Sequence, residues 1–258
     1  MIAIVLGTRA ELVKTFPIML ELQKRKIPYY FIHTGQHYLK KLCKDFNVKL
    51  PDVVLTKEQK ATTKFYGNAI KALFWAFSLI FKIRSVLNKI KNLKYVLYHG
   101  DTMTTAAAAL ASSYILNPFK KYKNVHLEAG LRSGSILEPF PEEISRKIAD
   151  NYSDILFAVS DLAEKNLKNE NNKGKIIKIG NTILDASLIS YNLAKKKKIK
   201  KISSDYALVS IHRHENIKNK KRLNKIVEII SYLQLKKYFF FMIIQKINLL
   251  NLIYIKNY

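Results

Sequence analysis

Three acidic side chains stand where a parallel α/β sheet would bring them together. Asp101 comes just after the apolar run 95–98, and Glu128 directly follows the apolar run 125–127. Glu142 follows a proline-rich turn at an expected helix start. Because ligands of open α/β sheets bind at the carboxyl ends of the strands, we expect these carboxylates to line one crevice. Neighbouring carboxylates raise one another's pKa, so one could act as an acid and another as a base.

Basic groups fall at similar places. The loop 7–9, Gly-Thr-Arg, joins an expected strand to an expected helix, where backbone N–H groups and the helix dipole favour an anion. Lys14 lies one turn further along and could reach the same anion. His212 ends the first expected strand of a second domain and would face the crevice from the other side.

Each of these residues also has an ordinary structural interpretation. Asp101 or Thr102 could simply cap a helix, a glutamate in a loop is mostly solvated, and a lone histidine is more often structural. The glycine loop is neither a GxGxxG nor a Walker pattern. Four ionisable groups at four strand or helix ends nevertheless favour a site. The sequence shows no metal-ligand spacing and no Ser/His/Asp arrangement, so we expect no metal centre.

Apolar runs and helical patterns alternate along the first 180 residues. This order predicts an α/β fold with a mostly parallel sheet and helices on both faces. The expected strands are 2–6, 29–33, 95–98, 125–127, 155–158 and 176–179, with a short strand or extended loop at 51–55. The expected helices are 10–24, 39–46, 62–91 (one or two helices), 104–116, 142–151 and 161–168.

The chain divides into two expected domains. Residues 1–190 form an N-terminal Rossmann-like domain that carries the acids, and residues 191–204 form a lysine-rich linker. Residues 205–258 begin a second domain, with a strand at 206–211 and a helix at 221–233. From about residue 234 the sequence lacks Gly, Pro, Asp and Glu. Because a further βαβ unit would need turn residues, we expect a degenerate or out-of-frame tail there.

Composition restricts the function classes. The net charge of +26 could indicate a nucleic-acid-binding protein, whose affinity would depend steeply on salt. Most of the 45 basic residues are lysines spread along the chain, however, so we expect no nucleic-acid partner. The single cysteine, Cys43, excludes an intramolecular disulfide. We read no signal peptide and no transmembrane helix, and expect a cytoplasmic location with no membrane partner.

Seven short motifs carry a family resemblance over residues 1 to about 230. In their order and spacing they resemble the non-hydrolysing UDP-N-acetylglucosamine 2-epimerases. The motifs are Gly7-Thr8-Arg9-Ala10-Glu11 with Lys14, Thr34-Gly35-Gln36-His37-Tyr38, His99-Gly100-Asp101-Thr102, Glu128-Ala129-Gly130-Leu131-Arg132, Pro141-Glu142-Glu143 with Arg146, Gly180-Asn181-Thr182 with Asp185, and His212-Arg213 with Glu215-Asn216.

The resemblance implies a glycosyltransferase-B type architecture with an active site in the interdomain cleft. It implies interconversion of UDP-GlcNAc and UDP-ManNAc without metal or nicotinamide, by elimination and re-addition of UDP, and a homodimer for the intact family. Asp101, Glu128, Glu142 and His212 match catalytic positions of that family. Arg9, Lys14, His212 and Arg213 match positions that would bind the UDP-sugar substrate.

One departure from the family pattern is large. The family's second domain continues for more than a hundred residues and includes an Asp-Ser-Gly-Gly type loop that holds the nucleotide, which this sequence lacks. We therefore expect an incomplete second Rossmann-like domain and no turnover or very slow turnover. Two alternatives stay open: an epimerase acting on a related diacetamido sugar nucleotide, and an inactive remnant that binds a partner subunit or nothing.

Overall fold

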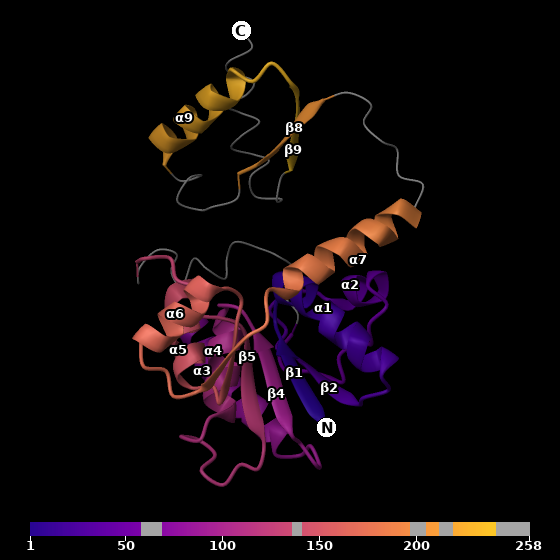
Figure 1. The fold of residues 1–258 in the computed structure, drawn as a ribbon, viewed down its shortest axis with the longest axis vertical. Coiled ribbons are helices and arrows are strands. Elements are labelled where there is room, and N and C mark those ends of the chain that lie inside the picture. The colour runs from indigo at the N-terminus through magenta and orange to yellow at the C-terminus, as the bar shows by residue number, and fades with distance from the viewer. Residues whose placement is uncertain (58–68, 136–140, 197–204, 212–218, 241–258) are drawn as a thin grey trace. The chain divides into compact units, whose positions relative to one another are not determined.

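Two compact units make up the chain, residues 1–196 and residues 197–258, and each is described by itself. The structure is a computed structural model, and it describes all residues except 58–68, 136–140, 197–204, 212–218 and 241–258 (Figure 1).

The N-terminal unit is built on a parallel seven-stranded sheet in the order β3-β2-β1-β4-β5-β6-β7. The strands are β1 (Ile2–Leu6), β2 (Tyr29–His33), β3 (Val53–Val54), β4 (Tyr95–His99), β5 (Lys123–Ala129), β6 (Ile155–Ala158) and β7 (Lys175–Lys178). The strand order reverses between β1 and β4. At such a switch point the loops that follow the two strands diverge, which leaves a crevice for a ligand.

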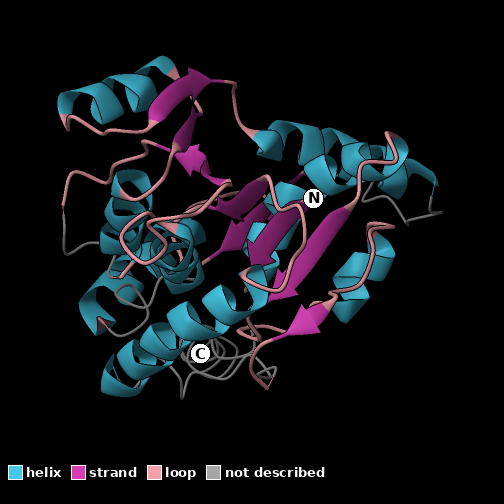
Figure 2. Ribbon diagram, turned by 90° about the horizontal axis from the view of Figure 1, so that it is seen from below, coloured by secondary structure: helices cyan, strands magenta, loops and turns pink. Residues whose placement is uncertain are grey.

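Helices cover both faces of this sheet (Figure 2). They are α1 (Arg9–Lys24), α2 (Lys40–Asp45), α3 (Ala69–Leu87), α4 (Met103–Ser112), α5 (Glu142–Asn151), α6 (Asp161–Asn169) and α7 (Thr182–Lys196). Successive side chains of a strand point to opposite faces. Ile4 and Leu6 of β1 therefore pack with α1, α2 and α7, whereas Ala3 and Val5 pack with α3, α4 and α5. The expected α/β fold is confirmed.

Two elements of this unit differ from the sequence-based expectation. The helix expected over 104–116 ends at Ser112, because the Asn117 amide donates to the carbonyl oxygens of Ala111 (2.7 Å) and Ser113 (3.3 Å) and so replaces helical hydrogen bonds. Helix α7 was not expected. It runs through Lys196, so the residues expected to start the linker at 191 belong to its last turns.

The second unit contains a parallel pair of strands, β8 (Tyr206–Ser210) and β9 (Lys236–Phe240), and the helix α9 (Lys220–Ser231). The strand and helix expected at its start are confirmed. Residues 236–240, which fall within the tail expected to be degenerate or out of frame, form a strand that pairs with β8. The connection 232–235 suffices for the turn without Gly or Pro, and aromatic residues such as Tyr238 favour a strand.

A membrane-spanning element is not found in the part of the chain that the structure describes, since no helix there combines sufficient length with sufficient apolar character.

Two glycines in the loop after β5 allow a matched test of close packing. Gly130 and Gly134 both have a φ of +83°. A Cβ added at Gly130 would lie 2.3 Å from the backbone oxygen of Ala163 in α6, whereas one added at Gly134 would meet no atom of the described residues within 4 Å. We expect Gly130→Ala to lower the free energy of unfolding by about 3 kcal/mol, and Gly134→Ala by about 1 kcal/mol. Urea unfolding followed by circular dichroism measures both values, and equal losses would contradict the packing argument.

Candidate functional site

Glu128 has an unusual backbone conformation. Its φ is +67°, and the pairing of β5 with β6 shifts register between Leu127 and Ala129, as at a β-bulge. For a residue with a Cβ the left-handed conformation costs about 1–2 kcal/mol. Strain of this kind is typical of functional sites. The backbone therefore singles out the acid that the sequence also singles out.

The Glu128 carboxylate is buried, with 6% of its side chain exposed. It accepts hydrogen bonds from one residue on α1 and from the residue that precedes α7. The Lys14 ammonium of α1 lies 2.8 Å from Oε1 and 2.6 Å from Oε2. Asn181, the residue before α7, donates to Oε1 at 3.1 Å. A buried carboxylate without such partners would be strongly unfavourable. Sequence reasoning placed Lys14 near an anionic ligand, and the structure places it on Glu128.

His99 approaches the same carboxylate from the end of β4. Its Nδ1 lies 3.7 Å from Glu128 Oε2, and within the described part of the chain it has no hydrogen-bond partner. Burial holds the pKa of His99 well below its usual range, and the charges of Lys14 and His126 lower it further. The imidazole is therefore neutral near pH 7.

Asp101 is the second predicted acid, and it follows β4 beside Glu128's strand. Its side chain is 33% exposed and forms an ion pair at 2.5 Å with Arg146 of α5. Thr102 caps α4 by accepting a hydrogen bond from the Thr105 N–H at 3.2 Å. Asp101 is thus not used as the helix cap, and its carboxylate remains partly accessible to solvent.

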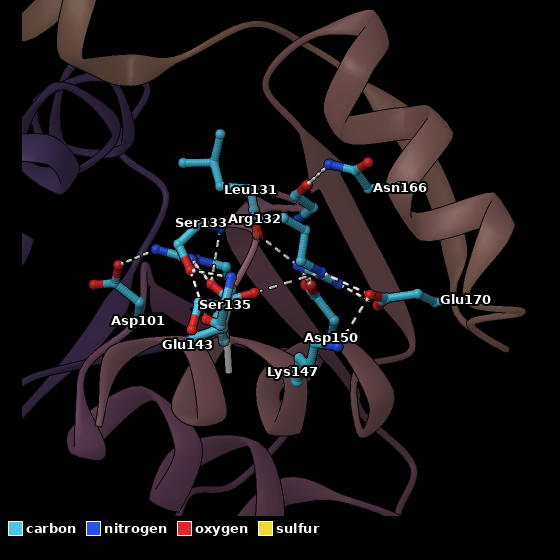
Figure 3. A network of polar contacts seen from close by, with 12 residues as sticks. Asp101, Leu131, Arg132, Ser133, Ser135, Glu143, Lys147, Asp150, Asn166 and Glu170 are labelled. Carbon is cyan, nitrogen blue, oxygen red and sulfur yellow. Dashed lines mark hydrogen bonds and ion pairs between the residues drawn. The ribbon is translucent and has the colours of Figure 1, made fainter. Parts of the chain in front are cut away.

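A buried polar network centred on Arg132 supports the Asp101 side of the site (Figure 3). Arg132 donates to Asp150 (2.8 Å) and to Glu170 (2.9 Å). Asp150 also lies 2.7 Å from His126 Nδ1, and Nε2 of the same ring lies 2.7 Å from the Gly100 carbonyl oxygen. Burial alone would lower the pKa of Arg132, but these carboxylates raise it overall. The network fixes the residue that precedes Asp101.

Glu143 joins this network to Asp101. It is buried, hydrogen-bonded to Arg146, and 3.9 Å from Arg132. Arg146 therefore bridges two carboxylates, one buried (Glu143) and one partly exposed (Asp101).

The glycine loop after β1 is tied down by Glu11. The Glu11 carboxylate accepts from the N–H groups of Gly7 (2.8 Å) and Thr8 (2.6 Å), which completes a capping box at α1. Burial raises the pKa of Glu11, although its hydrogen bonds oppose this. The two backbone donors expected to bind an anion are therefore already used. Arg9 remains exposed, with Nε 3.4 Å from the Tyr38 carbonyl oxygen.

The remaining predicted site residues are Glu142, His212 and Arg213. Glu142 is the first residue of α5 and is partly buried. His212 and Arg213 lie outside the described residues. In the described ranges, no group of three His, Cys, Asp or Glu side chains could hold a metal ion.

Sequence reasoning did not select Asn181, His126 or Asp150 as site residues. His126 lies within an apolar strand, a pattern that indicates a core residue. Asp150 lies four positions after Arg146 in α5, which is typical of a solvated helix face. Asn181 belonged to a quoted motif, but nothing in the sequence linked it to Glu128.

Comparison with known proteins gives a consistent result. The family model described as UDP-N-acetylglucosamine 2-epimerase matches residues 20–248. The UDP-N-acetylglucosamine 2-epimerase of Methanocaldococcus jannaschii is 36% identical over 88% of this chain and 60% of the relative. A crystal structure of the M. jannaschii protein in complex with UDP-GlcNAc and UDP matches with a TM-score of 0.80 at 32% identity, covering 99% of this chain and 70% of that one.

A relative with another substrate also matches. The UDP-2,3-diacetamido-2,3-dideoxy-D-glucuronate 2-epimerase of Pseudomonas aeruginosa is 30% identical over 90% of this chain and 62% of the relative. The chain spans about 60% of the length of the curated relatives that it matches.

The depressed pKa of His99 predicts a pH dependence of stability. Below about pH 6.5 an unfolded chain protonates this histidine and the folded chain does not, so stability is lost as pH falls. Just below that value this group alone should contribute a slope of up to about 1.4 kcal/mol per pH unit. We expect His99→Gln to remove this contribution, so that the curve of unfolding free energy against pH is flatter below about pH 6.5. Parallel curves for the two proteins would contradict the assignment.

Proposed function

The chain belongs to the UDP-N-acetylglucosamine 2-epimerase family, and from that premise we propose that its N-terminal unit carries the proton-transfer groups of a reaction that interconverts UDP-GlcNAc and UDP-ManNAc. The observation that supports this proposal most is Glu128, a buried carboxylate held in a strained conformation and matched by Lys14.

The chemistry sets three requirements. The C2–H bond is poorly acidic, so its proton leaves as the C1–O bond breaks and UDP departs with the bonding electrons. The product is a 2-acetamidoglucal with a C1–C2 double bond. Re-addition then returns a proton to the opposite face of C2 and the UDP oxygen to C1. The site must therefore provide proton-transfer groups on two faces and cations for the departing diphosphate.

The described residues supply two acids in different surroundings. Glu128 is buried and matched by Lys14, whereas Asp101 is partly exposed and paired with Arg146. Such a difference suits groups that hold and release a proton at different stages. In this proposal Asp101, Glu128 and Glu142 share the proton transfers, and the two faces are not assigned among them.

The same proposal assigns cationic side chains to the UDP moiety. Arg9 is exposed at the start of α1 and is available to a diphosphate. His212 and Arg213 are carried over from the family motif. Lys14 contributes by compensating the charge of Glu128, and the net charge of +26 favours the approach of an anionic sugar nucleotide.

A second substrate is kept because of the Pseudomonas aeruginosa relative, whose name specifies a diacetamido glucuronate sugar nucleotide. It would undergo the same exchange at C2. The two substrates differ at C3 and C6, whereas the residues assigned roles above act at C2 and on the diphosphate.

Solvent isotope exchange tests the function. The chain is incubated at high concentration with UDP-GlcNAc in heavy water, and deuterium at C2 is followed by mass spectrometry and NMR. We expect slow deuterium entry, and Glu128→Gln should reduce its rate by about 100-fold or more, the usual effect of losing a general acid or base.

Glu164→Gln provides the matched control. Glu164 lies on α6 in a surface pair with Lys168 and is not among the described partners of Glu128 or Asp101, so the exchange rate of this variant should equal that of the unchanged chain. Exchange only with the diacetamido sugar nucleotide would favour the second substrate. Absence of exchange with either one would refute the proposed activity of this chain.

A further inference from the structure

We propose that Asn181 is a positioning residue for Glu128, with an amide group that the start of α7 locks in one orientation. The inference rests on the proposed function, because it assigns Asn181 a role in the proton transfer made by Glu128. Asn181 is the residue before α7, and its side chain is partly buried.

Two hydrogen bonds fix the amide. Asn181 Oδ1 accepts from the Ile183 N–H at 3.0 Å, the bond of an N-capping side chain. The same side chain donates from Nδ2 to Glu128 Oε1 at 3.1 Å. If the amide were flipped, two donors would face each other at Ile183 and two acceptors at Glu128. The helix start therefore leaves only one orientation, in which an N–H points at the carboxylate.

The capping helix is itself held beside the lysine that shares Glu128. Ile183 and Ala186 of α7 belong to the same apolar cluster as Leu12 and Phe16 of α1. Lys14 also lies on α1, on a flexible four-carbon stem with 31% of its side chain exposed. The Asn181 N–H therefore points at the carboxylate in a fixed direction, whereas the Lys14 ammonium can change its position.

The arrangement distinguishes the two carboxylate oxygens. Oε1 receives both Lys14 and Asn181, which uses its two acceptor positions. Among the described residues, Oε2 receives a hydrogen bond from Lys14 alone, and Nδ1 of neutral His99 lies 3.7 Å away. Oε2 is therefore the oxygen that exchanges a proton with C2. In the described part of the chain, the charged, titratable and polar groups found against the Glu128 carboxylate are Lys14, His99 and Asn181.

Two substitutions separate capping from contact. Asn181→Ser keeps a good N-cap, but the hydroxyl is too short to reach Glu128. Asn181→Asp also keeps the cap and the shape, and it replaces the N–H by an oxygen about 3.1 Å from Oε1, where two carboxylates repel each other.

Asn219→Asp is the matched control. Asn219 caps α9 by accepting from the Arg222 N–H at 3.1 Å, and within the described residues its side chain makes no hydrogen bond to a carboxylate. All three variants should keep the unfolding temperature of the unchanged chain within a few degrees, because each retains a capping oxygen.

Two readouts decide the inference. The first is the 13C chemical shift of the Glu128 carboxylate, measured by NMR with 13C-labelled glutamate and assigned with Glu128→Gln, which needs no turnover. We expect this signal to move in both Asn181 variants, and further in Asn181→Asp, because both lose the N–H that points at Oε1 and Asn181→Asp replaces it by a carboxylate oxygen. The second is deuterium entry at C2, expected to fall about 10-fold in Asn181→Ser and about 100-fold in Asn181→Asp at pH 7.

The outcomes separate this inference from the proposed function. A Glu128 carboxylate signal that is the same in both Asn181 variants and in the unchanged chain would overturn the positioning role. An unchanged exchange rate in both Asn181 variants would overturn it as well. A moved signal together with no deuterium entry into the unchanged chain would uphold the contact and count against the proposed substrate instead.

Discussion

Buried carboxylates at the carboxyl edge of the parallel sheet are the constraint on which the arrangement of the site depends. Glu11, Glu128, Glu143 and Asp150 are all buried. Each would be strongly unfavourable without donors, and each finds at least one on another element or on a loop. Satisfying these four groups fixes the loops after β1, β4 and β5, as well as the starts of α1, α5 and α7. The described parts of these loops are therefore tied to the unit's core by hydrogen bonds and ion pairs.

The same constraint gives the two candidate acids different properties. Glu128 is enclosed and shares its charge with Lys14, while Asp101 meets solvent and Arg146. Arg146 is itself held by Glu143, and Gly100 by His126. Hydrogen-bonded groups in a low-dielectric interior need little reorganisation when charge moves, and this preorganisation is the main electrostatic contribution of a protein to catalysis.

The sequence predicted the sheet well because both of its faces are buried. Unbroken apolar runs such as 2–6 then have one interpretation, and the cap of α1 at Thr8 follows from a local motif. It failed where a distant contact decides the outcome. Asn117 ends α4 by reaching back to two carbonyl groups, and β9 forms because β8 is there to pair with it.

The candidate site shows the same division. Asp101 and Glu128 could be found because they stand at or just beyond the ends of apolar runs. Glu11 appeared to be only a first-turn acid, whereas it occupies the backbone donors that an anion would otherwise use. The link between Asn181 and Glu128 joins α7 to β5, and a linear pattern contains no signal for it. The sequence position of an acid can predict that it belongs to a site, but the residues that bind its charge are determined by the fold.

The packing of the first helix against the last helix of the N-terminal unit has a consequence for synthesis. The apolar cluster that includes Leu12 and Phe16 also includes Ala186, and β1 pairs with β4 from Ile2 opposite Tyr95. During translation α1 therefore leaves the ribosome long before α7, the helix that covers it, has been synthesised. The nascent chain must carry an uncovered apolar surface through most of translation of this unit, the period in which chaperones bind such segments. Closure of the core by α7 then makes folding of the unit a late event.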